Sequence, residues 1–149
     1  MNINSQNSCP CCSEMPYSLC CEHFIEGLQL PDTPEQLMRS RFTAFVLKNV
    51  DYILSTVTGP AKTTQTKESL QSSLNEVEWQ KLEVVRSAIL ETGLGEVEFK
   101  AYYSLNNETH ILHEISTFQR IENKWHYKDG QLIERSEEHT SELQSPCNL

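Results

Sequence analysis

The stretch EVEFKAYYSLNNETHILHEISTFQRI, residues 96–121, decides the fold because it contains two strand patterns joined by a turn. In its first half hydrophobic and polar residues alternate, as in a half-buried strand. The hydrophobic residues that share one face are Val97, Phe99, Ala101 and Tyr103. Residues 109–121 alternate more weakly, and LNNET between the two halves has the composition of a hairpin turn. The sequence therefore predicts an antiparallel hairpin with one buried face.

Further strand patterns flank this hairpin. Residues 79–90, WQKLEVVRSAIL, give a mixed pattern before it. Residues 124–130, KWHYKDG, follow it after a second turn at residues 122–124. About four strands in succession, joined by short turns, predict an antiparallel meander.

The segment before the strands carries helical patterns. Asp32 and Thr33 are N-cap candidates, and the proline after them suits a first helical position. Apolar residues then recur at three- and four-residue spacing, with a break near Asn49. Residues 67–77 read as a short third helix after a loop rich in Gly, Pro and Thr. Helices followed by a meander predict an α+β domain, residues 32–134, in which helices cover one sheet face.

Composition and charge exclude several classes of partner. The 149 residues carry a formal net charge of −9, with a pI of about 5.0, which argues against nucleic acid. No apolar run approaches the roughly 20 residues that span a bilayer, and the N-terminus lacks the basic and apolar regions of a secretory signal. We therefore expect a cytoplasmic protein without a nucleic-acid or membrane partner, in a compartment that keeps thiols reduced.

The N-terminal part contains a cluster of cysteines. Residues 1–8 are expected to be disordered, and residues 9–27 form a module too small to hold a core of its own. In a reducing compartment such clusters bind metal more often than they form disulfides. Four thiolates spaced C-x-C-x8-C-C can close a tetrahedral zinc shell, which is typical of a structural Zn²⁺ site. The predicted ligands are Cys9, Cys11, Cys20 and Cys21.

Other interpretations of the cysteines remain open. Structural disulfides would need an oxidising compartment, which the N-terminus does not support. Redox chemistry commonly uses a C-x-x-C pair beside a βαβ unit; Cys9 and Cys12 have this spacing, but no such unit follows them. His23 lies two residues after Cys21 and could replace one of the four ligands.

The last residues, 135–149, break the pattern of the chain. The segment RSEEHTSELQSPCNL has no apolar periodicity and matches the translation of a common sequencing adapter. We therefore expect an adapter-derived, disordered tail and a gene sequence that is truncated at or near Glu134. Cys147 then drops out of the cysteine set, and the remaining chain stays acidic.

The cysteine segment CPCCSEMPYSLCC resembles the SEC-C motif, a small zinc module with the usual form C-P-C-G-S-G-x-x-Y-x-x-C-C/H. The residues that match this form are Cys9, Pro10, Cys11, Ser13, Tyr17, Cys20 and Cys21. Cys12 and Glu14 stand where the motif has glycine, a residue often used where the backbone takes positive φ. Cys12 therefore either strains the loop or competes as a ligand.

The segments LMRSRFTAFVLKNVDYILST, VEFKAYY, LHEISTF and KWHYKDG resemble the core of the YchJ-like family. In that family a SEC-C motif precedes a nuclear-transport-factor-two-like (NTF2-like) domain, a cone of helices on a curved sheet. The resemblance covers roughly residues 9–130. STVTGPAK stands where the family usually has a Trp-His-Pro segment, and Ile115 and Thr117 replace arginines of an H-E-R-S-R-F pattern. Many members carry a second, C-terminal SEC-C motif. The resemblance implies a fold and a metal but no reaction.

Polar residues of the α+β domain suggest a catalytic site in the cone. Cones of this kind often hold a pocket, and some relatives are isomerases, dehydratases or hydrolases. A carboxylate or imidazole could act as general base, and an arginine could position an anionic substrate. The catalytic candidates are Arg39, Arg41, His113, Glu114 and Asp129. His113 and Glu114 are adjacent on a strand, so they point to opposite faces and cannot share one pocket. A structural interpretation pairs Arg39 or Arg41 with Glu114 and assigns Asp129 to a turn.

Two functions follow from these observations. The first is a non-enzymatic, zinc-containing binding or adaptor protein, whose zinc module docks another protein and whose cone holds a small molecule or a partner segment. The alternative is a small acid–base enzyme without a redox cofactor, with its active site in the cone. An enzyme predicts an enclosed pocket where an acid faces an arginine. An adaptor predicts a filled cone and exposed apolar surface beside the zinc module.

Overall fold

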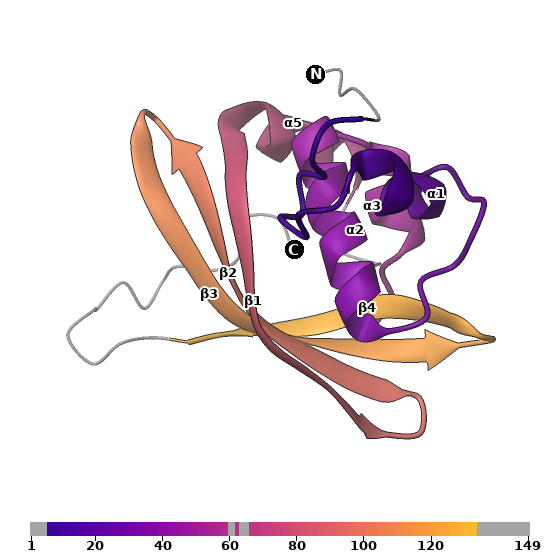
Figure 1. The fold of residues 1–149 in the computed structure, drawn as a ribbon. Helices are drawn as coiled ribbons and strands as arrows, with labels where there is room; N and C mark the ends of the chain where they lie inside the picture. Colours follow the sequence, from indigo (N-terminus) through magenta and orange to yellow (C-terminus); the bar gives the residue numbers. More distant parts are fainter. Residues whose placement is uncertain (1–5, 60–61, 63–65, 134–149) are drawn as a thin grey trace.

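The computed structural model describes residues 6–59, 62 and 66–133, and Figure 1 shows its elements. Two short helical turns come first, η1 (Tyr17–Leu19) and α1 (Glu22–Ile25). The longer helices are α2 (Pro34–Leu47), α3 (Val50–Ser55) and α5 (Lys67–Glu76). The strands are β1 (Val77–Glu91), β2 (Leu94–Leu105), β3 (Glu108–Ile121) and β4 (Lys124–Leu132). The expected adapter-derived tail, residues 135–149, lies outside the described residues.

The strands form one antiparallel sheet in the order β1-β2-β3-β4, which confirms the predicted meander. Asn106 and Asn107 adopt positive φ in one turn, as do Glu122 and Asn123 in the next. Two-residue type I′ hairpins require positive φ at both central positions. The sheet is strongly curved, and its concave side holds α2, α3 and α5 (Figure 1). The α+β cone of helices on a curved sheet is therefore confirmed.

Local capping fixes where α2 and α3 begin. The Thr33 side chain accepts a hydrogen bond from the backbone N–H of Gln36, and Pro34 occupies the first helical position. Lys48 ends α2 in the left-handed conformation, with φ of 60°, and the side chain of Asn49 then caps α3. The start of α2 and the break after it therefore lie where the sequence predicts them.

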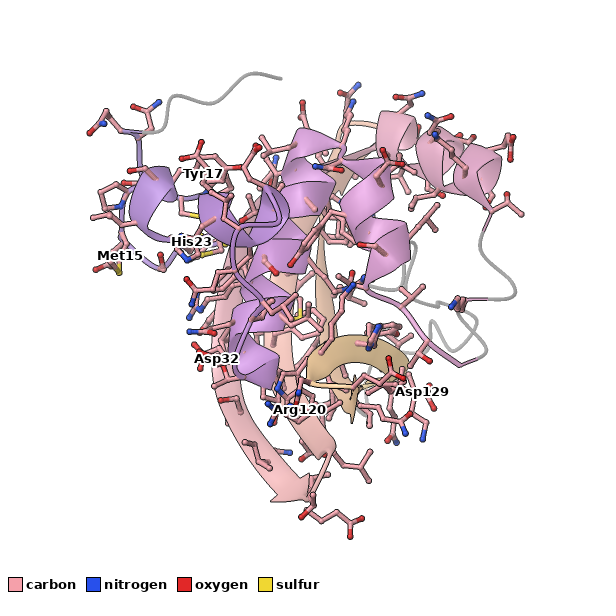
Figure 2. The ribbon with its side chains drawn as sticks, turned by 90° about the vertical axis from the view of Figure 1, so that its right-hand side faces the viewer. Met15, Tyr17, His23, Asp32, Arg120 and Asp129 are labelled. Carbon is pink, nitrogen blue, oxygen red and sulfur yellow. The ribbon has the colours of Figure 1, made fainter. Side chains whose placement is uncertain are left out.

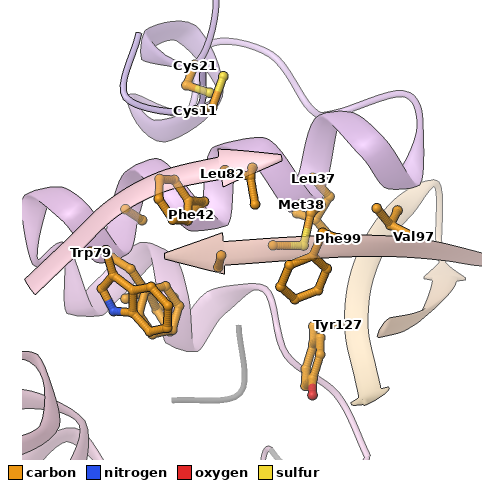
Figure 3. Packing of buried hydrophobic residues seen from close by; sticks show 14 of the residues in the cluster. Cys11, Cys21, Leu37, Met38, Phe42, Trp79, Leu82, Val97, Phe99 and Tyr127 are labelled. Carbon is orange, nitrogen blue, oxygen red and sulfur yellow. The ribbon is translucent and has the colours of Figure 1, made fainter. Parts of the chain in front are cut away.

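Helix α2 forms the centre of the core. Every residue from 40 to 45 is buried, so the helix is covered on all sides rather than along one stripe. Figure 3 shows Leu37, Met38 and Phe42 of α2 above Phe99 of β2. Burying one such side chain contributes about 2–3 kcal/mol to folding. The contact of α2 with the sheet is therefore a large part of the folding free energy.

The cysteine module begins earlier than the sequence predicts. Asn7 accepts a hydrogen bond at its carbonyl oxygen from the N–H of Tyr17, with an N···O distance of 2.8 Å. Ser8 forms an isolated antiparallel bridge with Pro16. The disorder expected for residues 1–8 therefore does not extend to Asn7 and Ser8, and residues 7–27 are the cysteine module below. Residues 1–5 lie outside the described residues.

Gly95 of β2 lies directly beneath the first turn of α2. A Cβ atom at this position would overlap Pro34 Cγ and lie 3.1 Å from the carbonyl oxygen of Ala88 in β1. We predict that Gly95→Ala lowers the free energy of unfolding by about 1–3 kcal/mol, because the added methyl pushes α2 off the sheet. Urea unfolding followed by circular dichroism measures the loss.

The double variant Gly95→Ala/Pro34→Ala is the control for this prediction. Removing the proline ring makes room for the added methyl, so the double variant should lose less stability than the sum of the two single variants. Strictly additive losses would contradict the proposed overlap.

Candidate functional site

The structure brings the four predicted metal ligands together. The sulfur atoms of Cys9, Cys11, Cys20 and Cys21 all lie within 4.8 Å of one another. The Sγ–Sγ distance is 3.5 Å between Cys11 and Cys20 and 3.8 Å between Cys20 and Cys21. All four cysteines are free of disulfides, three are buried, and Cys20 is half-buried. Four convergent sulfur atoms without a disulfide among them could hold one metal ion.

Tight turns place the two cysteine pairs opposite each other. The N–H of Cys9 donates to the carbonyl oxygen of Met15 at 2.8 Å, which closes the loop that carries the first pair. The N–H of Cys20 donates to the carbonyl oxygen of Tyr17 at 3.0 Å and ends η1 just before the second pair. Tyr17, between the two pairs, is itself buried, and its N–H donates to the carbonyl oxygen of Asn7. Backbone hydrogen bonds therefore bring ligands from both ends of the segment to one point.

The sulfur cluster fits a tetrahedral metal ion. Four thiolates around zinc, with metal–sulfur bonds of about 2.3 Å, place neighbouring sulfur atoms about 3.8 Å apart. The two sulfur–sulfur distances above are close to this value. Hydrogen bonding with Cys21, together with Ser13, lowers the pKa of Cys20 to about 6, whereas hydrogen bonding with Cys11 and Cys20 raises the pKa of Cys21. Because the thiols compete for protons, all four could ionise together only with a cation bound between them.

Polar groups of α2 contact the cysteine cluster from outside. Thr43 donates from its hydroxyl to Cys21 Sγ at 3.4 Å, and the same hydroxyl lies 3.6 Å from Cys9 Sγ. Arg39 donates from Nη1 to the carbonyl oxygen of Cys11 at 2.8 Å, and from Nε to Glu35 at 3.0 Å. Arg39, a catalytic candidate from the sequence, therefore lies at the cysteine module and not in the cone.

Cys12 is not part of the sulfur cluster of the described residues. Its backbone adopts φ of 68°, and its exposed sulfur accepts a hydrogen bond from the N–H of Leu82 at 3.4 Å. Glu14 likewise adopts φ of 71°. Both residues therefore take the left-handed conformation of the glycines they replace, at a cost of roughly 1–2 kcal/mol each. Of the two roles expected for Cys12, the structure supports strain and a contact with β1, not competition for the metal.

The structure also locates the histidine that could have replaced a ligand. His23 lies on α1, where its ring contacts Phe24 edge-on with centroids 4.4 Å apart, and it is outside the sulfur cluster of the described residues. Figure 2 shows His23 with Met15 and Tyr17 on the module, on one side of α2, and Asp129 on the other side.

A second group of polar residues lies inside the cone. Arg41 and Glu114 are 0 % and 1 % exposed, the most deeply buried charged side chains among the described residues. Arg41 donates from Nη1 to the carbonyl oxygen of Ile53 at 2.9 Å and to Thr56 Oγ1 at 2.6 Å. Its guanidinium carbon lies 5.0 Å from the ring centroid of Tyr127. Arg41 thus stabilises the end of α3 while it brings a positive charge into the cone.

Glu114 is held beside this positive charge. Its Oε2 accepts a hydrogen bond from the Ser116 hydroxyl at 2.8 Å. Burial raises the pKa of Glu114 to about 7, against the lowering effect of Ser116 and Arg41. The predicted direct pairing with an arginine is not observed, since no ion pair between described residues joins Glu114 to Arg39 or Arg41. Arg39 bonds to Glu35 and to the Cys11 carbonyl oxygen instead. Arg41 lowers the pKa of Glu114 by the electrostatic effect of its positive charge, without an ion pair.

The remaining catalytic candidates lie outside the cone. His113 Nε2 lies 2.8 Å from Glu98 Oε2 on the outer face of the sheet, so His113 and Glu114 point to opposite faces as expected. Asp129 is exposed, and its Oδ1 accepts a hydrogen bond from the N–H of Gly130 at 2.7 Å. The assignment of Asp129 to a turn is wrong, because the residue lies within β4 beside a register shift opposite Thr117.

Sequence reasoning missed Tyr127, Thr56 and Thr43. Tyr127 follows Trp125 at strand spacing in KWHYKDG, so its inward direction could have been read from the alternation. The sequence around Thr43 and Thr56 does not indicate a functional role, because threonine is common within helices and just after them. Their roles depend on how α2 meets the module and α3.

Comparisons with known proteins agree with this architecture. Residues 33–130 match the family of the YchJ middle NTF2-like domain. A UPF0225 protein from Serratia proteamaculans (strain 568) is 42 % identical over 125 residues, which cover 82 % of this chain and 81 % of that protein. The chain belongs to the YchJ-like family.

Two solved structures extend the similarity to the cysteine module. The solution structure of a SEC-C motif containing protein from Rhodopseudomonas palustris has a TM-score of 0.79 at 27 % identity, covering 86 % of this chain and 100 % of that chain. The crystal structure of a SEC-C motif containing protein from Psychrobacter arcticus has a TM-score of 0.76 at 29 % identity, covering 97 % and 91 % of the two chains. The family resemblance seen in the sequence is therefore confirmed.

Among the described residues of this YchJ-like chain, no helix is both long enough and apolar enough to cross a membrane.

The cysteine cluster predicts a defined metal content. We expect about one metal ion per chain in the purified protein, because four sulfur atoms close one tetrahedral shell. Cys20→Ser should lower the content well below one, since it removes a ligand. Cys12→Ser should leave it near one, because this sulfur lies outside the cluster. Elemental analysis with thiol quantification tests both. Equal loss in the two variants would refute the assignment of ligands.

The buried Glu114 predicts a pH dependence of stability. Its folded-state pKa of about 7 exceeds the ordinary value of 4.5, so the folded protein binds this proton more tightly than the unfolded chain. The stability contributed by protonated Glu114 is complete below pH 4.5 and is lost as the pH rises through 7. Relative to Glu114→Gln, the wild type should lose roughly 2–3 kcal/mol of unfolding free energy over this window.

Urea unfolding at a series of pH values measures this difference. Glu98→Gln is a matched control on the outer face, where hydrogen bonding with His113 lowers the pKa of Glu98, so its effect on the pH dependence should have the opposite sign. A wild-type profile parallel to that of Glu114→Gln would disprove the assignment.

Proposed function

We propose that this YchJ-like protein is a non-enzymatic, zinc-binding adaptor in which a structural Zn²⁺ ion fixes the cysteine module and the module docks another protein. Thiolate ligands in a tetrahedral set favour zinc among the available divalent metals. A shell closed by four protein ligands leaves no position for a substrate. The observation that carries this proposal is the convergence of four sulfur atoms within 4.8 Å.

The zinc ion would hold the module against the cone. The module buries few side chains of its own, and Cys9, Cys11 and Cys21 are among them. Thr43 and Arg39 connect these cysteines to α2. Metal binding therefore supplies folding free energy to the module and positions it on α2.

A cleft of about 430 Å³ lies between the module, α3 and the start of β4. We call it the module cleft. Its apolar lining residues include Phe24, Ile25, Leu30, Pro31 and Trp125. Leu30 remains 48 % exposed and Leu28, in the same loop, 81 %. A cleft of this size accommodates one or two large apolar side chains. Exposed apolar surface beside the zinc module is what an adaptor predicts.

Charge indicates which partner suits the module cleft. The segment 9–33 contains four acidic residues and no Lys or Arg. Glu26 and Asp51 line the cleft, and its one lysine, Lys124, donates to the carbonyl oxygen of Ser55 at 3.2 Å. Complementary charge favours a partner segment in which apolar side chains alternate with Lys or Arg. We therefore propose a basic, apolar segment of another protein as the occupant.

A second candidate function has one observation in its favour. Glu114 is a buried acid with a pKa near 7, within the field of Arg41, as a general acid or base in the cone would be. An acid–base enzyme with its active site in the cone is therefore the alternative to the adaptor. The adaptor ranks first because it accounts for the metal site and the module cleft together.

Three short synthetic peptides test the docking proposal: one alternating Lys and Leu, one with Glu in place of Lys, and one with Ser in place of Leu. We predict that only the Lys/Leu peptide shifts the NMR signals of Ile25, Leu30 and the Trp125 indole. Added salt should weaken the binding of this peptide. Leu30→Ser should weaken binding about tenfold, because it removes one buried leucine contact.

Ile89→Ser is the matched control, since Ile89 is 60 % exposed on the β1–β2 hairpin, away from the cleft. Binding of the Glu/Leu peptide with equal affinity, or equal loss in both variants, would overturn the docking proposal. Elemental analysis that finds a metal other than zinc would overturn the zinc assignment independently.

A further inference from the structure

The turn that carries the first cysteine pair brings a fifth cysteine close to the sulfur cluster. The N–H of Cys12 donates to the carbonyl oxygen of Cys9 at 3.1 Å, which closes a four-residue turn around Pro10 and Cys11. Such turns hold their first and last Cα atoms within about 7 Å, and the commonest type favours proline at its second position and glycine at its fourth. Cys12, at φ of 68°, therefore places a thiol at the position that favours glycine.

The geometry of this turn suits a disulfide between Cys9 and Cys12. A disulfide joins Cα atoms that are about 4.4–6.8 Å apart, which lies within the span of the turn. The Cys12 sulfur lies beside the turn, 3.6 Å from the carbonyl oxygen of Pro10. Rotation of the Cys12 side chain away from the N–H of Leu82 is therefore enough to direct its sulfur to Cys9, and the module need not unfold. Cys11 is a poorer partner, because a bond between adjacent cysteines distorts the peptide group that joins them.

Exposure separates Cys12 from the four proposed ligands. Among the described cysteines Cys12 alone is exposed, whereas Cys9, Cys11 and Cys21 are buried and Cys20 is half-buried. A small oxidant in solvent therefore meets the Cys12 sulfur first, and Cys9 is within reach of that sulfur. An accessible thiol beside a second thiol is the usual arrangement of redox-sensing cysteines.

We propose that Cys12 makes the metal site sensitive to oxidants: hydrogen peroxide oxidises Cys12, and a Cys9–Cys12 disulfide then removes one ligand from the four-sulfur shell. This inference rests on the metal site of the proposed function and adds its regulation. It does not depend on the docking role of the module cleft.

The reaction balances with peroxide as the one oxidant. The Cys12 sulfur attacks a peroxide oxygen, the O–O bond breaks, and Cys12 becomes a sulfenic acid while one water leaves. The Cys9 sulfur then attacks the Cys12 sulfur, so an S–S bond forms and the S–O bond breaks. The departing oxygen takes up a proton and leaves as a second water. The two sulfur atoms together lose two electrons, which the peroxide gains.

The disulfide acts on both contacts of the module with the rest of the fold. Without Cys9, three thiolates remain, which do not close a tetrahedral shell. Cys9 Sγ lies 3.6 Å from the Thr43 hydroxyl of α2, and Cys12 Sγ accepts from the N–H of Leu82 in β1. Oxidation changes the first contact and breaks the second. The oxidised module therefore binds its metal less tightly and is held less firmly against α2 and β1.

Metal release from the full chain tests this inference. Every chain carries Cys147→Ser, so that the thiol near the C-terminus cannot exchange with the module. Zinc-loaded protein is treated with a small excess of hydrogen peroxide beside a coloured zinc chelator. We expect the chain with Cys12 to release close to one zinc ion, while Cys12→Ser and Cys12→Gly retain most of theirs over the same period. Cys12→Gly restores the residue that the turn favours, so it keeps the fold. A dithiol reductant and added zinc should return the first chain to its starting content.

Mass spectrometry identifies the bond without reference to metal. Free thiols are alkylated after peroxide treatment, and fragmentation of the N-terminal peptide locates the disulfide. We expect the disulfide between Cys9 and Cys12, and none in Cys12→Ser. A disulfide that joins Cys20 to Cys21 instead, or a dimer linked through Cys12, would overturn the inference.

The two proposals fail in different ways. Reduced protein that holds no metal would overturn both the proposed zinc site and its regulation. Reduced protein that holds zinc, and loses it to peroxide as fast in Cys12→Ser as in the chain with Cys12, would overturn this inference alone.

Discussion

The burial of α2 between the cysteine module and the concave face of the sheet is the constraint on which the rest of the structure depends. Because residues 40–45 are all buried, one layer alone cannot cover this helix. The sheet covers the side of Phe42 and Phe45, whose rings lie about 6 Å from that of Trp79. The module covers the side of Thr43 through its cysteines. The module is thus a second layer of the core rather than an appendage.

This arrangement explains how a strained module is retained. Two non-glycine residues, Cys12 and Glu14, hold positive φ within a few positions of each other. Such strain persists only where surrounding contacts over-determine the conformation. Here the convergent sulfur atoms, the contact of Cys12 with β1 and the bond from Arg39 to the Cys11 carbonyl all fix the same loop. A metal ion at the centre of these contacts would act on the loop and on the outer side of α2 together.

Much of the fold could be predicted from local sequence, because alternation, capping residues and turn residues act over a few positions. Thr33, Asn49 and the Asn106–Asn107 turn are examples. The convergence of the cysteines followed from their spacing for the same reason. The polar cluster of the cone did not, since it depends on the register shift between β3 and β4 and on the lack of a side chain at Gly130. Arg39 and Arg41, two residues apart, point to different layers, and only the packing of α2 decides which faces the cone.

The two buried polar residues of the cone differ in what they contribute to stability. A buried carboxyl with an unpaired oxygen is expensive, and replacing buried charges by apolar side chains of similar volume is often neutral or stabilising. Fold maintenance alone would therefore favour an apolar residue in place of Glu114. Arg41 differs, because its bonds to Ile53 and Thr56 stabilise the end of α3. Glu114 makes one hydrogen bond, to its own strand neighbour Ser116, and ties no second element of the described chain in place. Glu114 therefore costs stability without fixing a second element of the described chain, which sets it apart from Arg41 on the same side of α2.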